Sequence, residues 1–456
     1  MGTPPRKSPP GLPPGPYLVV GLARSGSAVA RALAERGEEV IGCDTGRPDE
    51  AQGLEGLGVE VNLDVDGTEL LDGVACVVKS PGVPGEAPVI AAARQRHMPV
   101  IGELEAAWRM IPNRFIAVTG TNGKTTVTEL IGHIYREAGL PVAVAGNVGT
   151  PLASFVDDLA EDATVVCECS SFQLEDTEMF APECAVFLNF APDHLDRHPN
   201  LESYLEAKLR IFARQGNDDV AVYSGDEAAL AGRDLGGCAR RVAFCTQRGD
   251  DPDCEVSLSA GVIFWGDNPL LEADRIRLIG AHNVQNAMAA AATALAMGVD
   301  VDSVTGGLRS FSAVPHRLEP VREIRGVTFV NDSKATNVAA AEAALRSFEG
   351  GVHAILGGSL KGESFARLLP TVSERCVACY LIGEAAQSLA TELAPAREAG
   401  VALRRCGGME HAVRAAAEVA APGQVILLAP ACASFDAYRD FEQRGEHFRA
   451  LVEALP

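Results

Sequence analysis

The sequence predicts an α/β protein with mainly parallel sheets, divided into three domains. Short runs of buried-strand residues alternate with helical runs in three regions of the chain, and aromatic residues make up only 5% of it. Since 456 residues exceed one ordinary hydrophobic core, we place the domains at 17–102, 103–313 and 314–456. The Pro-rich residues 1–16 lack the apolar stretch of a signal peptide and are expected to be disordered.

The N-terminal domain opens with a strand–helix–strand pattern typical of a Rossmann-like fold. Its first helix is expected to end at Gly37, a residue suited to the left-handed conformation that often follows a helix. The expected elements are a strand at 17–20, a helix at 27–36, and strands at 39–43 and 74–79.

The central domain contains a strand that leads into a Gly-rich loop and then a helix, an order that indicates a P-loop ATPase-like domain. The expected elements are a helix at 103–110, a strand at 115–118, a helix ending near 138, strands at 164–167, 185–188, 220–223 and 262–264, and an Ala-rich helix at 283–297.

The C-terminal domain repeats the alternation and is also predicted to be Rossmann-like. The expected strands are 327–330, 352–356, 378–382 and 424–428, and the expected helices are 337–348, 384–393 and 409–420. Cys376 and Cys379 form a CxxC pair, but no second pair or His run lies nearby. An apolar strand is therefore favoured over a zinc site.

Composition argues against several classes of function. The formal charge of −22 and the pI near 4.9 disfavour a nucleic-acid partner, whose phosphates would be repelled. No apolar run reaches the roughly 18–20 residues of a transmembrane helix. The 12 cysteines mostly lie in apolar stretches, as Cys43 and Cys245 do, which is typical of buried thiols in a reducing compartment. We expect a cytoplasmic protein without membrane insertion, and a monomer.

The strongest functional signal is the loop after the strand at 115–118. Its residues are Gly120, Thr121, Asn122, Gly123, Lys124, Thr125 and Thr126. Backbone N–H groups around Gly123 would surround the phosphates of ATP, Lys124 would reach the β- and γ-phosphates, and the Thr125 hydroxyl would bind Mg²⁺. Val118 occupies the first Gly position of the usual pattern. A Gly-rich turn that merely caps the helix is the alternative.

A second Gly-rich turn, Gly21-Leu-Ala-Arg-Ser-Gly26, follows the first predicted strand and has Ala23 at the middle Gly position. Asp44 ends the next strand, as the acidic residue of a dinucleotide site does. This pattern fits NAD, the diphosphate of a UDP-sugar, or a purely structural turn.

Polar residues follow two strands of the central domain. Glu168 follows one strand, and Asp193 and His194 come shortly after the other. Because parallel sheets bind ligands at the C-terminal ends of their strands, these side chains are expected near the phosphate loop, where they suit Mg²⁺ better than Zn²⁺. Alternatively, Glu168 supports a helix N-terminus and His194 lies on the surface. The composition around Lys208 indicates only a solvated helix.

Four motifs of the C-terminal domain lie beside predicted strands and combine small polar residues with one charge. They are His316–Glu319, Asn331–Asn337, Gly357–Gly362 and Ala431–Asp436. Their repetition at several strand ends favours a rim that faces a ligand, although Asn337 would also serve as a helix cap.

With these motifs the sequence resembles the Mur ligases, the ATP-dependent amide-forming enzymes of peptidoglycan precursor synthesis, from about residue 17 to residue 456. The whole family and its folylpolyglutamate synthase relatives share Thr119–Thr125. The branch that adds D-glutamate to UDP-N-acetylmuramoyl-L-alanine is indicated by Glu168–Leu174, Asn331–Asn337, Ala431–Asp436 and Phe441–Gly445. Branches that add L-alanine, lysine or diaminopimelate are expected to carry Tyr-Ala-His in place of the Asn331–Lys334 segment.

The resemblance implies a reaction in which ATP phosphorylates the substrate carboxylate and D-glutamate then displaces phosphate from the acyl phosphate. It implies ATP binding by Gly120–Thr126, Asn286, Arg317, Asp332 and Lys334. It implies two Mg²⁺ sites, one at Thr125 and Glu168 and one at His194 and a carbamylated Lys208. The implied catalytic residues are Lys124, Asn147, Glu168, His194 and Lys208.

The resemblance also implies two further binding sites. The UDP-substrate would contact Ala23, Arg24, Ser25, Asp44, Thr45, Ser80, Asn147 and Gln173, and D-glutamate would contact Thr336, Lys361, Ser434 and Phe441. Two departures from the family pattern concern a hydroxyl and a uracil contact. Thr125-Thr126 stands for Ser-Thr and keeps the hydroxyl, whereas Gly46 stands where the family has Arg and Arg47 follows one residue later.

Three other functions compete with this interpretation. An NAD-dependent oxidoreductase would account for Gly21–Asp44 but not for Gly120–Thr126. A P-loop regulatory switch would bind a protein partner without turnover. A folylpolyglutamate synthase would share the phosphate loop, but Phe441–Gly445 fits it poorly.

Overall fold

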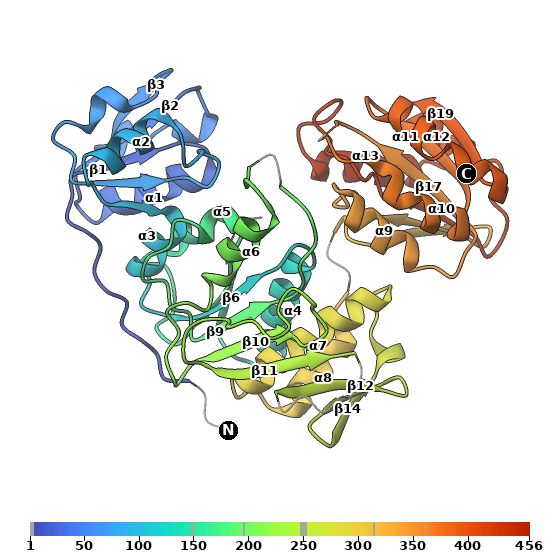
Figure 1. Cartoon of the computed structure of the whole chain (residues 1–456), viewed down its shortest axis with the longest axis horizontal. Helices are drawn as coiled ribbons and strands as arrows, with labels where there is room; N and C mark the ends of the chain where they lie inside the picture. The colour runs from blue at the N-terminus through green and yellow to red at the C-terminus, as the bar shows by residue number, and fades with distance from the viewer. Residues whose placement is uncertain (1–3, 147–149, 195–196, 247–252, 313–314, 361) are drawn as a thin grey trace. The chain divides into compact units, whose positions relative to one another are not determined.

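The computed structural model describes residues 4–146, 150–194, 197–246, 253–312, 315–360 and 362–456 (Figure 1). The chain forms two compact units, one of residues 1–273 and 286–309 and one of residues 274–285 and 310–456. A five-stranded and a nine-stranded sheet lie in the first unit, and a six-stranded sheet lies in the second.

The N-terminal sheet is parallel throughout, in the order β3-β2-β1-β4-β5. Its strands are β1 (Tyr17–Val20), β2 (Val40–Asp44), β3 (Glu60–Leu63), β4 (Cys76–Lys79) and β5 (Val100–Gly102), with helices α1 (Arg24–Glu35) and α2 (Pro88–Gln95). The chain changes direction across the sheet between β1 and β4, which is where doubly wound sheets bind ligands. Gly26 lets α1 approach closely, since a Cβ there would lie 1.7 Å from the carbonyl oxygen of Gly21.

The central sheet has the order β14-β13-β12-β11-β10-β9-β6-β8-β7. Its strands are β6 (Arg114–Thr119), β7 (Val142–Gly146), β8 (Thr164–Glu168), β9 (Cys184–Phe187), β10 (Val220–Ser224), β11 (Arg240–Cys245), β12 (Cys254–Ser259), β13 (Val262–Trp265) and β14 (Asn268–Glu272). The accompanying helices are α3 (Glu103–Met110), α4 (Lys124–Glu137), α5 (Ser171–Leu174), α6 (Leu201–Leu209), α7 (Ala281–Ala296) and α8 (Val301–Ser310). From β7 to β12 the pairs are parallel, and β12–β14 form an antiparallel extension.

The second unit holds a sheet of order β15-β16-β20-β17-β18-β19, in which only the β15–β16 pair is antiparallel. Its strands are β15 (Glu319–Ile324), β16 (Val327–Asn331), β17 (Val352–Gly357), β18 (Cys376–Ile382), β19 (Ala402–Gly407) and β20 (Val425–Leu428). Its helices are α9 (Val338–Arg346), α10 (Leu369–Arg375), α11 (Ala386–Glu392), α12 (Met409–Ala417) and α13 (Phe441–Glu453). The CxxC pair lies in β18, as the sequence predicts.

These sheets confirm the predicted α/β class. Every residue of β1, β8 and β17 is buried, as expected for parallel strands covered on both faces by helices. Among the described residues, none of the helices combines the length and the apolar character required to cross a bilayer.

The segment 4–16 differs from the expected disordered extension, because it packs on the first unit (Figure 1, dark blue). The Lys7 amide donates to Glu183 Oε1 at 2.9 Å, and the Lys7 amine pairs with Asp219. Arg109 Nη1 donates to the Gly11 carbonyl at 3.0 Å. Its Pro-rich composition excludes regular elements, but two buried carboxylates of the central domain give the segment fixed partners.

The cysteines also differ in part from the prediction of buried, reduced thiols. Cys245 of β11 and Cys254 of β12 are joined by a disulfide. The pairing of adjacent strands explains the bond, since it brings their Cα atoms to 6.1 Å. Cys43 remains a free, buried thiol.

Replacing Lys7 with Met should destabilise the first unit, because Glu183 and Asp219 would lose their cation. The Lys7 side chain is 30% exposed, so we expect a loss of about 1–2 kcal/mol, less than for a fully buried pair. Urea unfolding measures this loss. Arg36→Met, which removes an exposed pair with Asp157, should cost at most about 0.5 kcal/mol. Equal losses in both variants would contradict the prediction.

Candidate functional site

The phosphate loop connects β6 to α4 in the first unit. Gly120 and Gly123 have φ angles of 152° and 83°, which only glycine adopts without strain. A Cβ on Gly120 would lie 3.0 Å from the Cβ of Leu188, and one on Gly123 would lie 2.4 Å from Asn286 Oδ1. The loop is therefore held tightly between β9 and α7, and α7 brings Asn286, a predicted ATP ligand, against it.

Two lysine amines converge on the carbonyl oxygen of Gly120. Lys124 Nζ donates to it at 3.1 Å and to the Thr121 carbonyl at 2.8 Å, while Lys208 Nζ, from α6, donates to it at 2.7 Å. Lys208 is 1% exposed, whereas its composition predicts a solvated helix. Burial first, and then the charge of Lys124, hold the pKa of Lys208 well below its usual value. The buried Lys208 amine is therefore shifted toward its uncharged form.

Thr125 and Glu168 lie side by side at the start of α4 and the end of β8. The Thr125 hydroxyl donates to Glu168 Oε2 at 2.5 Å, and Glu168 is 4% exposed. A hydroxyl and a carboxylate are oxygen ligands of the type that Mg²⁺ prefers. Among the described residues, no three or more His, Cys, Asp and Glu side chains lie together as a metal site, so hydroxyl and lysine-derived ligands would be needed as well.

His194 has a left-handed φ of 55° and a 40% exposed side chain. Its Nε2 is 3.6 Å from Asp193 Oδ2, and its ring packs edge-on against Phe172 at 5.0 Å. The ring of Tyr204 lies 6.1 Å from that of His194, and Lys208 Nζ lies 4.6 Å above the Tyr204 ring. Aromatic contacts thus connect His194 with Lys208.

A cavity of about 570 Å³ lies at the C-terminal ends of β1, β2 and β4. It is lined by all six predicted residues of its domain: Ala23, Arg24, Ser25, Asp44, Thr45 and Ser80. Asp44 accepts from the backbone N–H of Leu22 at 2.7 Å and of Gly46 at 2.8 Å, which fixes the first turn. Arg47 instead pairs with Asp64 at 2.6 Å.

Two other predicted contacts of the UDP-substrate lie elsewhere or cannot be placed. Gln173 is buried; its Oε1 accepts from the Ser170 N–H at 2.9 Å, and its Nε2 donates to Glu103 Oε2 at 3.3 Å. Burial raises the pKa of Glu103 to about 7. Gln173 therefore caps α5, and its substrate contact stays a prediction. Asn147, like Lys361 of the predicted D-glutamate site, lies outside the described residues.

In the second unit the predicted ligands gather on the loops after β16 and β20. Lys334 Nζ lies 3.6 Å above the Phe441 ring, and the Thr336 N–H donates to the Lys334 carbonyl at 2.7 Å. Burial raises the pKa of Asp332 to about 7, against the opposing effects of the Leu318 N–H and the charge of Arg317.

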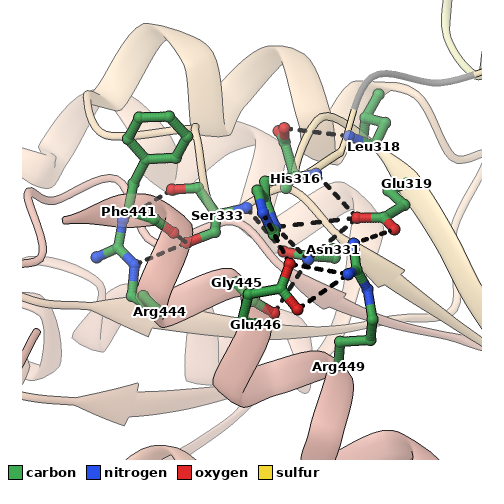
Figure 2. Close-up of polar contacts among 11 residues, drawn as sticks. His316, Leu318, Glu319, Asn331, Ser333, Phe441, Arg444, Gly445, Glu446 and Arg449 are labelled. Atoms are coloured by element: carbon green, nitrogen blue, oxygen red, sulfur yellow. Dashed lines mark hydrogen bonds and ion pairs between the residues drawn. The ribbon is translucent and has the colours of Figure 1, made fainter. Parts of the chain in front are cut away.

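Arg444, within the Phe441–Gly445 motif, joins these two loops. Its guanidinium, 1% exposed, donates to Ser333 Oγ at 3.0 Å and to the Ser333 carbonyl at 2.8 Å (Figure 2). It also donates to the carbonyls of Cys432 and Ala433 at 3.1 and 3.0 Å, directly before Ser434. Burial lowers its pKa to about 10, so it stays charged. Arg444 thus fixes the spacing of the two loops that carry the predicted ligand contacts.

Gly445, next in the same helix, allows α13 to contact His316 (Figure 2). A Cβ on Gly445 would lie 2.2 Å from His316 Nδ1. That ring nitrogen lies 2.9 Å from Asn331 Nδ2, which also donates to the Gly445 carbonyl at 3.2 Å. The Phe441–Gly445 motif thus also serves packing, because Gly445 leaves room for His316. The sequence pattern alone does not indicate this packing role.

Family models match most of the chain. They are the Mur ligase MurD-like N-terminal domain at 16–102, the Mur ligase middle domain at 118–294, and the Mur ligase glutamate ligase domain at 316–432. Curated relatives named UDP-N-acetylmuramoylalanine--D-glutamate ligase are 42% identical in Acidobacterium capsulatum and 41% in Geobacter metallireducens. The alignments cover 96% of this chain and 96% and 97% of those relatives.

The chain belongs to the Mur ligase family.

Solved Mur ligase structures share the fold at low sequence identity. UDP-N-acetylmuramate-alanine ligase from Thermotoga maritima superposes with a TM-score of 0.59 at 19% identity, covering 96% of this chain and 99% of that one. A pseudomurein peptide ligase from Methanothermus fervidus gives 0.56 at 19% identity, with the same coverage. Membership of the Mur ligases favours the ligase interpretation over an oxidoreductase or a regulatory switch.

In this Mur ligase, Gly445→Ala should destabilise the second unit by about 1–3 kcal/mol, because the added methyl group would overlap His316. Gly350→Ala is the matched control, since a Cβ there meets nothing within 4 Å and should change stability by at most about 0.5 kcal/mol. Thermal unfolding followed by calorimetry compares the two variants. A Gly445→Ala protein as stable as its control would show that α13 does not depend on this close contact.

Proposed function

We propose that the protein is an ATP-dependent ligase that joins D-glutamate to the L-alanine carboxylate of UDP-N-acetylmuramoyl-L-alanine, releasing ADP and phosphate. The observation that carries the proposal is the phosphate loop with Lys124, Thr125 and Glu168 beside it, in a chain similar over its full length to D-glutamate ligases. We also propose that it acts in the cytoplasm as a monomer.

The first step is phosphoryl transfer. A carboxylate oxygen of the substrate attacks the γ-phosphorus of ATP, the bond from that phosphorus to the bridging oxygen breaks, and ADP leaves with the electron pair. Both reactants are anions, so alignment and charge neutralisation supply the catalysis. The Lys124 amine, 2.8 Å from the Thr121 carbonyl, lies where it can exchange loop carbonyls for phosphate oxygens.

The second step forms the amide. The uncharged amine of D-glutamate attacks the acyl-phosphate carbonyl, a C–N bond forms, and phosphate leaves with the C–O bonding electrons while the nitrogen loses a proton. We propose that His194, which is 40% exposed and packed against Phe172, orients this amine.

Thr125 and Glu168 would hold one Mg²⁺, and His194 with a carbamylated Lys208 would hold a second. Bound Mg²⁺ would neutralise charge on the phosphate oxygens. The carbamate requires an uncharged amine that adds to CO₂ and loses a proton, and the lowered pKa of Lys208 supplies that form. The reaction turns a cationic side chain into an anionic oxygen ligand, which suits Mg²⁺.

We propose that the domain at 17–102 binds UDP in the cavity beside Ser80, and that Asn147 and Gln173 contact the muramoyl portion. The domain at 103–313 would bind ATP, and the domain at 314–456 would close over it. Asn286 of the central domain would contact the nucleotide. The proposed nucleotide contacts from the C-terminal domain are Arg317, Asp332 and Lys334. The proposed D-glutamate contacts are Thr336, Lys361, Ser434 and Phe441.

Phosphate release from ATP in the presence of UDP-N-acetylmuramoyl-L-alanine should depend on D-glutamate. We expect at least about ten-fold faster release than with L-glutamate, lysine or no amino acid, because only the correct amine consumes the acyl phosphate. A coupled phosphate assay measures all four conditions. Equal release in all four would refute the proposed function.

Lys208→Ala should lower the rate about 100-fold or more, since it removes the amine that would carry the carbamate. Arg214→Ala, at an exposed position after the same helix, should stay within two-fold of wild type. A ¹³C signal of a lysine carbamate, measured in labelled bicarbonate, should be present in the wild type and missing in Lys208→Ala. Wild-type activity in Lys208→Ala would show that this role is wrong.

A further inference from the structure

Lys79, the last residue of β4, carries a buried amine that the proposed reaction does not use. Its side chain is 0% exposed. Nζ donates to the Val83 carbonyl at 2.8 Å and lies 2.7 Å from Asp176 Oδ2 and 3.8 Å from Glu175 Oε1. The amine therefore joins its own loop in the N-terminal domain to a segment 97 positions later in the chain.

The N-terminal-domain end of this contact belongs to the UDP cavity. Ser80 and Val83 both line that cavity, and the Ser80 hydroxyl donates to the Gly21 carbonyl at 2.6 Å. Because Lys79 precedes Ser80 and binds the Val83 carbonyl, it holds both ends of the turn 80–83.

The other end of the contact belongs to the region of proposed chemistry. Asp176 follows α5, the short helix that contains Phe172 and begins directly after the Glu168 strand and its capping residue. Phe172 packs against His194. Asp176 is only 4% exposed and is held further by Arg94 Nη2 at 3.6 Å and by the Gly102 N–H, which donates to its carbonyl at 3.0 Å.

A buried ion pair of this kind contributes little net stability, since desolvation of both charges offsets their attraction. Its geometric effect is larger, because neither charge tolerates displacement into an apolar environment. A buried ion pair between the two proposed ligand sites therefore fixes the distance between them, even though it adds little net stability.

We propose that Lys79 is a positioning residue that acts through Asp176. It holds the UDP cavity and the site of phosphoryl transfer at a fixed distance and orientation, which we call their register. This inference rests on the proposed function, in which one substrate occupies both regions, with its UDP moiety in the cavity and its carboxylate at the γ-phosphate. UDP alone occupies only the cavity, so its affinity does not depend on the register.

The test compares Asp176→Asn with the double variant Lys79→Met/Asp176→Asn. Asp176→Asn keeps the Lys79–Val83 hydrogen bond, so the cavity turn remains and only the register is lost. We expect kcat/KM for UDP-N-acetylmuramoyl-L-alanine to fall about ten- to a hundred-fold, as a small misplacement of reacting groups does. The Kd of UDP from calorimetry and the KM of ATP should change less than two-fold.

The double variant separates positioning from folding. It removes both buried charges, so its Tm should return toward the wild-type value, while kcat/KM for the UDP-substrate stays low because the Lys79–Asp176 contact is missing. Asp72→Asn is the matched control, since it breaks an exposed pair with Arg96 in the same domain and should change kcat/KM less than two-fold.

Three results would overturn the inference: wild-type kcat/KM in Asp176→Asn, loss of UDP affinity in parallel with kcat/KM, or recovery of kcat/KM together with Tm in the double variant. A wild-type protein that does not turn over UDP-N-acetylmuramoyl-L-alanine would instead refute the proposed function. In that case, an unchanged Tm in the Asp176→Asn protein would also overturn the role of Lys79, because the contact would then hold nothing in place.

Discussion

The central site depends on the carbonyl oxygen of Gly120. It accepts hydrogen bonds from Lys124 and from Lys208, and only the unusual φ of 152° at Gly120 lets the loop fold between β6 and β9 in this way. Because the two amines share one acceptor, the charge of Lys124 opposes a charge on Lys208. Burial and the charge of Lys124 together shift Lys208 toward the uncharged amine.

This constraint explains how a protein of charge −22 can bind several anions. The global field is unfavourable, so anion binding has to come from groups placed within a few ångströms of the ligand. The N-terminal cavity would do so with a helix N-terminus and backbone N–H groups next to Asp44, which is itself engaged by the N–H groups of Leu22 and Gly46. The central site would do so with Lys124 and with oxygen ligands suited to Mg²⁺.

The sequence predicts the interior of the fold far better than its edges. The interior strands β1, β8 and β17 are fully buried and read as apolar runs, and they were predicted. All six strands at the sheet edges were missed: β3, β5, β7, β14, β15 and β19. An edge strand is covered less completely, so it mixes exposed and buried residues and shows no continuous apolar run, as in the Ala402–Gly407 strand.

The same limit applies to the candidate site. Residues whose role follows from a local pattern, such as Lys124 after Gly123, could be placed from the sequence on a strand–loop–helix unit. The six cavity residues lie within two turns and one strand end, so they too could be grouped. Lys208 and Arg444 could not, because their surroundings come from parts of the chain that lie 88 and 111 positions away. Composition near Lys208 resembles any solvated helix, and only the fold buries its amine.

Three buried basic side chains illustrate how the surroundings divide similar groups into different roles. Lys79, Lys208 and Arg444 each donate to backbone carbonyls of a ligand-bearing loop. Lys79 also has a carboxylate at 2.7 Å, and Arg444 keeps its proton despite burial, so both act as fixed charges that hold loops in place. Lys208 instead has the charge of Lys124 near it, and burial together with that charge lowers its pKa. The proposed carbamate chemistry at Lys208 would use this difference, which comes first from burial and then from the like charge of Lys124.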